Sequence, residues 1–276
     1  MFGDMPEGGK NASPYGGWRI TFNRFVWRAF IFAMGAFVVF VEKVLPNRGY
    51  GGRIASRAAK VMNRLVGAHV RVRGLERLDP RSSYVFVPNH RSHFDIAVLI
   101  AALPGARFAA KKELFDDPGL GPPMRALGMI PIDRDDPSAA RRALDDAATQ
   151  GRRKASVVIF PEGTRAPAGE MLPFKGGAFV FAIQAQAPVV PVALHNTANV
   201  MPAHGYLSIL GGPVVVEILD PIPTAGMAPE DRNHLKEQAS KTLIEALRPN
   251  DGGVADRKDL GSFRGRALGV RTSTSA

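Results

Sequence analysis

The chain has 276 residues, and its 45% hydrophobic content supplies a folded core and excludes a disordered protein. There is no cysteine, so disulfide frameworks and thiolate chemistry are excluded, which suits a reducing compartment. The formal net charge is +11, and residues 1–60 hold nine lysines or arginines against three aspartates or glutamates. A basic end of this kind favours an anionic polymer or an anionic membrane surface as partner.

The first predicted element is an apolar helix over residues 20–45, after a Gly- and Pro-rich start that we expect to be loose. Within it, residues 29–41 (AFIFAMGAFVVFV) carry no charge. As a helix this run spans about 20 Å, whereas the hydrocarbon of a bilayer is roughly 30 Å thick. We therefore expect the helix to lie in one leaflet, and a buried core helix is the alternative. A cleavable signal peptide is not expected, because the apolar run starts late and lacks a small-residue cleavage site.

The second predicted element is a basic amphipathic helix over residues 52–66. Its cations recur at steps of four, three and four residues: Arg53, Arg57, Lys60 and Arg64. An adjacent face carries apolar side chains: Ile54, Ala58, Val61, Met62 and Leu65. Such a helix is suited to lying on anionic headgroups, and a solvated charged face is the alternative. Residues 1–66 are thus predicted to form a two-helix membrane-associating segment.

The rest of the chain alternates short strands with helices. Strands are predicted over residues 69–73, 83–87, 107–110, 129–132, 156–160, 189–194 and 214–219. Helices are predicted over residues 94–103, 119–127, 137–150, 176–186 and 229–247. This alternation indicates an α/β fold with a mixed, mostly parallel sheet flanked by helices, forming one domain over residues 67–248. Residues 249–276, with few large apolar side chains, are predicted to be a flexible tail.

The turn at residues 89–95 (NHRSHFD) is polar, although it lies between a buried strand and an apolar helix. Ser92 and Asp95 match the [ST]-x-x-[DE] pattern of a helix start, which gives Asp95 a capping role. His90 lies outside the helix, and across such a turn its imidazole can meet Asp95. An imidazole held in this way is a general base near neutral pH. The pattern leaves both interpretations of Asp95 open.

Other strands also end in polar or cationic residues. Residues 159–165 (IFPEGTR) end in a loop with Gly163, Thr164 and Arg165, and α/β proteins place ligand sites in such loops. Lys111 follows the strand over 107–110, and Arg134 ends GMIPIDR at 128–134. Cations that converge on one point are suited to binding a phosphate. The alternative is that each of them is an unrelated charge on the surface.

Several chemistries find no motif in this sequence. A G-x-S-x-G elbow, a P-loop and a G-x-G-x-x-G fingerprint are all missing. His90 and His93 lack the spacing and companions of a metal site, so no metal is expected. The charge permits nucleic-acid binding, but no recognition helix or aromatic-rich basic strand is evident, so no nucleic-acid partner is expected.

Four blocks occur in order: NHRSHFD, GMIPIDR, FPEGTR and, at residues 189–193, VVPVA. With FAAKKEL (108–114) and FKGG (174–177), they resemble the 1-acylglycerol-3-phosphate (lysophosphatidate) acyltransferases. The resemblance covers roughly residues 65–220. It implies transfer of a fatty acyl group from a thioester of coenzyme A or acyl carrier protein to a lysolipid hydroxyl, with no other cofactor. The product of that reaction is phosphatidate.

The resemblance also implies roles for particular residues. His90 corresponds to the base and Asp95 to its orienting partner. The remaining matched residues correspond to the acceptor site: Lys111, Arg134, Glu162, Gly163, Thr164 and Arg165. Many members have Gln-Ser after the histidine, whereas this chain has Arg91 and Ser92, which leaves the acceptor headgroup open. The alternatives are another lysolipid acceptor, such as a lyso-ornithine lipid or a lysophospholipid, and a non-catalytic module that binds lipid or nucleic acid. We expect the protein on the cytoplasmic face of a membrane, as a monotopic or peripheral protein.

Overall fold

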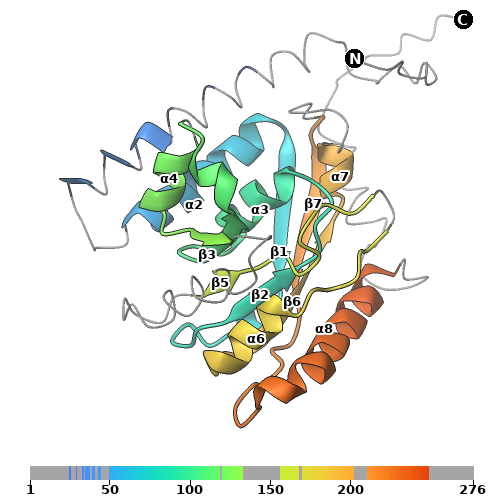
Figure 1. Ribbon diagram of the computed structural model, residues 1–276. Helices are drawn as coiled ribbons and strands as arrows, with labels where there is room; N and C mark the ends of the chain where they lie inside the picture. The colour runs from blue at the N-terminus through green and yellow to red at the C-terminus, as the bar shows by residue number, and fades with distance from the viewer. Residues whose placement is uncertain are drawn as a thin grey trace, which may run out of the picture.

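The computed structural model describes residues 50–132, 156–201 and 210–248, except 119, 168 and 169, and scattered positions between 25 and 44 (Figure 1). The described positions between 25 and 44 are all helical, as the sequence predicts. Four predictions lie outside the described residues: the loose start over 1–18, the helix over 137–150, the position of Arg134, and the tail over 249–276.

All seven predicted strands are present and join one sheet. They are β1 (Ala68–Arg73), β2 (Val85–Pro88), β3 (Arg107–Lys111), β4 (Ile130–Ile132), β5 (Val157–Val158), β6 (Val189–His195) and β7 (Gly212–Ile218). Their order across the sheet is β1-β7-β6-β2-β5-β3-β4. Every pair is parallel except β6 and β7, so the sheet is mixed and mostly parallel, which confirms that prediction. The strand β5 is shorter than its apolar run predicts.

The described helices are α2 (Tyr50–Leu65), α3 (Phe94–Ala102), α4 (Gly121–Ala126), α6 (Gly177–Gln184), α7 (Thr197–Val200) and α8 (Arg232–Leu247). The helix α7 was not predicted, because a single turn is too short for helical periodicity. It follows Asn196, which has a left-handed backbone (φ 65°). The end of the chain's last predicted helix is correct, but its first residues form a separate 3₁₀ turn, Pro229–Asp231.

The helices cover both faces of the sheet (Figure 1). Alternate residues of β2 enter different cores: Phe86 joins a cluster with α2 and α3, and Val85 joins a cluster with α6 and α8. This alternation follows from the two-residue period of a strand whose faces are both buried. The chain leaves β2 toward α3 on one face and leaves β5 toward α6 on the other. Where the connections after two neighbouring strands leave on opposite faces of the sheet, they leave a crevice at the carboxyl ends of the strands, and α/β proteins bind ligands there.

The helix α2 packs on α3 and β1 through only part of its surface. Its four cations, Arg53, Arg57, Lys60 and Arg64, are all exposed, as predicted. The predicted apolar face is divided: Met62 is buried in the core, whereas Val61 and Leu65 are 52% and 66% exposed. The buried face therefore lies further around the helix than predicted, and exposed apolar side chains remain on the other flank of the basic stripe.

Exposed apolar side chains also occur at the described positions before α2. They are Phe25, Phe37, Phe40 and Val44. Within the part of the chain that the structure describes, no helix is both long enough and apolar enough to cross a bilayer.

Candidate active site

The carboxyl ends of three adjacent strands bring the polar segments together. Phe86 of β2 pairs with Val158 of β5, and Val158 pairs with Phe108 of β3, so these three residues lie level in the sheet. His90 and Glu162 each follow the level residue of their strand by four positions, and Lys111 follows by three. Because the strands are parallel, their following residues gather at one edge of the sheet.

The His90 side chain is held by Asp95 at the start of α3. The His90 Nδ1 lies 2.8 Å from Asp95 Oδ2, and the Asp95 side chain is fully buried, whereas 14% of the His90 side chain is exposed. The same Oδ2 accepts the backbone N–H groups of Arg91 (2.8 Å) and Ser92 (2.9 Å). The carboxylate therefore caps the turn and contacts the imidazole at once, so the two contacts predicted for Asp95 occur together, and its catalytic role stays a prediction. When Nδ1–H donates to Asp95, Nε2 is free of a proton and can accept one.

The backbone of the histidine turn is fixed by its neighbours. Asn89 is buried, and its side-chain amide bonds the N–H and the C=O of Leu194 on β6 (2.7 and 3.2 Å). Ser92 Oγ accepts the N–H of Phe94 (3.0 Å) and donates to the C=O of Met201 (2.8 Å). Because the residue before His90 and the second residue after it are both held by hydrogen bonds, the His90 backbone has little freedom to move.

Glu162 is buried next to His90 and hydrogen-bonds its backbone. Its side-chain oxygens accept the N–H of His90 (2.8 Å) and the N–H of Leu172 (2.7 Å), and the residue is 2% exposed. Burial raises the pKa of the Glu162 carboxyl above its ordinary value, although the backbone hydrogen bonds from Leu172 and His90 oppose that shift. The Phe160 ring stacks on the imidazole, with centroids 3.9 Å apart and planes at 25°. Glu162 and Phe160 thus position His90.

The cations of the loop after β5 lie beside this turn. Gly163 has a left-handed backbone (φ 72°), and a Cβ built on it would come within 3.1 Å of the Lys175 Nζ, so the Lys175 side chain passes over the glycine. Arg165 is half-buried, and its Nη1 is buried with no hydrogen-bond partner among the described residues. Partial burial, and next the charge of Arg165, lower the pKa of His93, which precedes α3. The guanidinium is therefore near the histidine turn.

The predicted site residues are brought together to different degrees. His90, Asp95, Glu162, Gly163 and Arg165 gather at the turn, as described above. The Lys111 ammonium lies at the same sheet edge but pairs with Glu113 at 3.1 Å, and the Thr164 side chain is exposed.

Sequence reasoning missed two contributors, Phe160 and Lys175. Both occur within motifs that the sequence shows, FPEGTR and FKGG, but their contacts with His90 and Gly163 depend on the tertiary fold.

Arg91, named above as a departure from the family pattern, has a structural partner. Its Nε donates to the C=O of Glu170 at 3.0 Å, in the loop that also carries Arg165. This contact ties the histidine turn to the loop after β5. Arg91 is half-buried, so its guanidinium also adds positive charge at the edge of the site.

Known proteins to which this chain is similar are named as acyltransferases. The model of the acyltransferase family matches residues 69–195. An acyltransferase of Schizosaccharomyces pombe is 30% identical over 238 residues, which cover 83% of this chain and 85% of that protein. The human 1-acyl-sn-glycerol-3-phosphate acyltransferase alpha is 34% identical over 186 residues, which cover 67% of this chain and 65% of the human protein.

A solved structure shares the fold. The crystal structure of the 1-acyl-sn-glycerophosphate (LPA) acyltransferase PlsC from Thermotoga maritima matches with a TM-score of 0.69 at 25% identity, and the match covers 85% of this chain and 97% of that one. By contrast, this chain spans slightly less than two thirds of the length of the human relative.

Proposed function

The chain belongs to the acyltransferase family, and from that premise we propose that it moves a fatty acyl group from a thioester to the free hydroxyl of 1-acylglycerol-3-phosphate. The product is phosphatidate. The observation that carries this proposal is the His90–Asp95 pair, whose Nδ1 and Oδ2 are 2.8 Å apart, beside the half-buried cation Arg165. A base next to a cation suits an acceptor that carries both a hydroxyl and a phosphate. Relatives named for this activity in human and yeast support the same substrate.

In this proposal His90 is the general base. Its Nε2 removes the proton of the acceptor hydroxyl as that oxygen attacks the thioester carbonyl, because an alcohol is a poor nucleophile until it loses its proton. Asp95 holds the productive tautomer and stabilises the imidazolium that forms. The thioester is already reactive, so the acyl group passes directly to the acceptor, and the proton returns to the departing thiolate. The balanced products are the acylated lipid and a free thiol.

The proposed acceptor grip consists of Arg165 with Lys175, and with Lys111 and Arg134 from the neighbouring strand ends. The buried Arg165 Nη1, which no described residue hydrogen-bonds, suits an anionic ligand, because charge-assisted hydrogen bonds to phosphate satisfy it. A phosphate held in this way fixes the hydroxyl near His90 and makes the attack effectively intramolecular. Gly163 and Thr164 would line the approach, and Glu162 would act through the backbone of His90.

We also propose that residues 1–66 hold this domain on the cytoplasmic face of a membrane, with residues 67–248 as the acyltransferase domain and 249–276 as a flexible tail. The exposed cations of α2 and the exposed Phe37 and Phe40 support the first part of that division. Together they combine apolar burial with attraction to anionic headgroups, and each basic residue near the surface contributes about 1 kcal/mol.

An acceptor screen with purified protein tests the activity. Thiol release from acyl-CoA and from acyl carrier protein is measured with lysophosphatidate, lysophosphatidylcholine and a lyso-ornithine lipid. We expect turnover with lysophosphatidate to exceed the others at least tenfold, the effect of losing one charge-assisted contact in a sheltered site. Preference for a phosphate-free acceptor would contradict the proposed grip, and DNA binding without thiol release would favour a binding module.

A further inference from the structure

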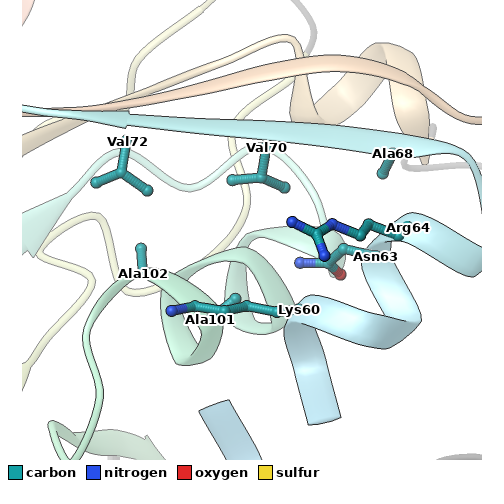
Figure 2. A pocket seen from close by; sticks show the side chains of 8 residues that line it. All are labelled: Lys60, Asn63, Arg64, Ala68, Val70, Val72, Ala101 and Ala102. Atoms are coloured by element: carbon teal, nitrogen blue, oxygen red, sulfur yellow. The ribbon is translucent and has the colours of Figure 1, made fainter. Parts of the chain in front are cut away.

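A cavity lies at the end of α3 that is remote from the histidine turn (Figure 2). Its volume is about 250 Å³. It is lined by Lys60, Asn63, Arg64, Ala68, Val70, Val72, Ala101 and Ala102. Three side chains reach it from α2; Val70, Val72 and Ala68 point into it from β1; and Ala101 and Ala102 close it from α3. Since Asp95 and Ala101 are six residues apart on one helix, about 9 Å of rise separates the cavity from the proposed catalytic pair.

The polar group inside this cavity is Asn63. The residue is 2% exposed, and both its Nδ2 and its Oδ1 are buried with no hydrogen-bond partner among the described residues. An unpaired buried amide is unfavourable, and asparagine is also a poor residue for a helix interior. Ser56, another buried polar residue on α2, donates its hydroxyl to the C=O of Ala101 at 3.2 Å. Among the described residues the Asn63 amide therefore has donor and acceptor capacity that a ligand in this cavity can satisfy.

The charge around Asn63 is positive. Lys60 and Arg64 both line the cavity and are exposed at its mouth, and no carboxylate lines it within the described part of the chain. Figure 2 shows the Arg64 guanidinium beside the Asn63 amide, below Val70. Two cations with no carboxylate among the described residues that line the cavity favour an anion, and the guanidinium fork suits the paired oxygens of a phosphate or a carboxylate.

The amide distinguishes between these two anions. Asn63 offers a donor and an acceptor, and neither has a hydrogen-bond partner in the part of the chain that the structure describes. A carboxylate only accepts hydrogen bonds, so it would leave the Asn63 oxygen unpaired. A phosphate that carries a hydroxyl accepts from the Asn63 NH₂, Lys60 and Arg64 and also donates to the Asn63 oxygen.

We propose that this cavity binds a phosphate group bearing a hydroxyl donor, and that its source is the headgroup of an anionic lipid. The flanking residues Val61 and Leu65 support the lipid source, because they are 52% and 66% exposed on the same helix. The volume also fits a headgroup, since pockets for whole drug-sized ligands run from about 300 to 1,000 Å³. The site is separate from the proposed acyl-transfer site.

The first test uses Asn63→Leu, which changes no charge. The full chain is sedimented with phosphatidylcholine vesicles that contain phosphatidylglycerol, whose headgroup carries hydroxyls. General electrostatic attraction predicts no loss for this variant, whereas loss of a specific contact predicts an apparent affinity about tenfold lower. The unfolding temperature of Asn63→Leu without lipid should equal or exceed that of the wild type. Ser56→Ala is the matched control: it should lower the unfolding temperature and keep vesicle affinity.

Arg64→Gln tests the same cavity with an exposed residue, so it keeps the proposal falsifiable if Asn63→Leu does not fold. Arg57→Gln removes one charge from the same stripe outside the cavity. We expect about fivefold weaker binding for Arg57→Gln, the effect of one general surface charge, and more than tenfold weaker binding for Arg64→Gln. Equal losses for the two arginine variants, with full binding by Asn63→Leu, would overturn the proposal and leave only a general basic surface.

A third arm separates the lipid from a free anion. Thermal unfolding is followed in inorganic phosphate, acetate and chloride at equal ionic strength, with Arg165→Ala as the background so that the proposed acceptor site does not contribute. A rise in unfolding temperature that occurs in phosphate but not in acetate or chloride, and that disappears when Asn63→Leu is added, identifies a free-phosphate site and overturns the lipid source. Vesicle binding that depends on Asn63 without such a shift supports the headgroup.

Discussion

Two groups of residues at the same sheet edge are held in different ways. The histidine half, which we define as His90, Asp95 and Glu162, is fixed by hydrogen bonds to backbone groups: three N–H donors on Asp95 and Glu162 come from residues 90, 91 and 92. The cation half, defined as Lys111, Arg165 and Lys175, has a salt bridge at Lys111 and, at Arg165, a buried nitrogen that no described residue hydrogen-bonds. The proposed base is thus positioned before any substrate arrives, whereas in the proposed mechanism the cations gain their main partner from the substrate.

The largest expected effect comes from His90→Ala. We expect acyl transfer to fall by on the order of 10²–10⁴-fold, because the acceptor hydroxyl loses its base. The backbone N–H groups of residues 90–92 keep their hydrogen bonds to Glu162 and Asp95 in this variant, so circular dichroism should be unchanged. His234→Ala, an exposed histidine of α8, is the matched control and should keep full activity. If His90→Ala retains a third of the wild-type turnover, the base is another group.

Asp95→Asn should reduce turnover by on the order of 10–10³-fold, less than loss of the base, because the imidazole survives but its tautomer is no longer enforced. The variant also weakens three hydrogen bonds to Oδ2, so unfolding by urea should show a loss of about 1–3 kcal/mol. An unchanged turnover together with that loss of stability would make Asp95 a cap only.

Arg165→Ala addresses the cation half. We expect the KM for lysophosphatidate to rise about 10- to 100-fold, which corresponds to about 1.5–3 kcal/mol for a charge-assisted contact. The KM for the acyl donor should change little, and stability should not fall, because no described residue hydrogen-bonds the buried nitrogen. Equal changes in both KM values would place Arg165 outside the acceptor grip and remove the contrast between the two halves.

The smallest expected effect concerns His195, which lies at the end of β6 outside both halves. Burial lowers its pKa, although Glu217, 3.4 Å away, opposes the shift. A histidine whose folded pKa is lowered binds its proton first in the unfolded chain, so stability falls as pH drops below about 6.5. His195→Gln should flatten that part of the curve in thermal unfolding. His93 shifts in the same direction, so some slope should remain; an unchanged slope would exclude His195 as its source.

The sequence predicted what depends on local pattern. Strand positions followed from apolar runs between turns, and the meeting of His90 with Asp95 followed from their spacing across a helix start. It predicted a mixed sheet, but not the order of the strands or that β6 and β7 are the antiparallel pair, because both are set by packing between distant segments. The role of Glu162 was missed for the same reason: the acceptor role implied by resemblance did not show that its carboxylate binds backbone groups of His90 and Leu172.

The long-range anchoring of the histidine turn has a consequence for protein engineering. The Glu162 contact with His90 spans 72 positions of the chain, and the Ser92 contact with Met201 spans 109. A graft of the heptapeptide NHRSHFD onto another scaffold would keep the cap on Asp95 but lose both of these anchors. The smallest transplantable unit is therefore the ends of β2 and β5, the loop to Leu172, and the segment from the end of β6 through α7 to Met201. Designs built on the motif alone should yield a histidine with no fixed direction.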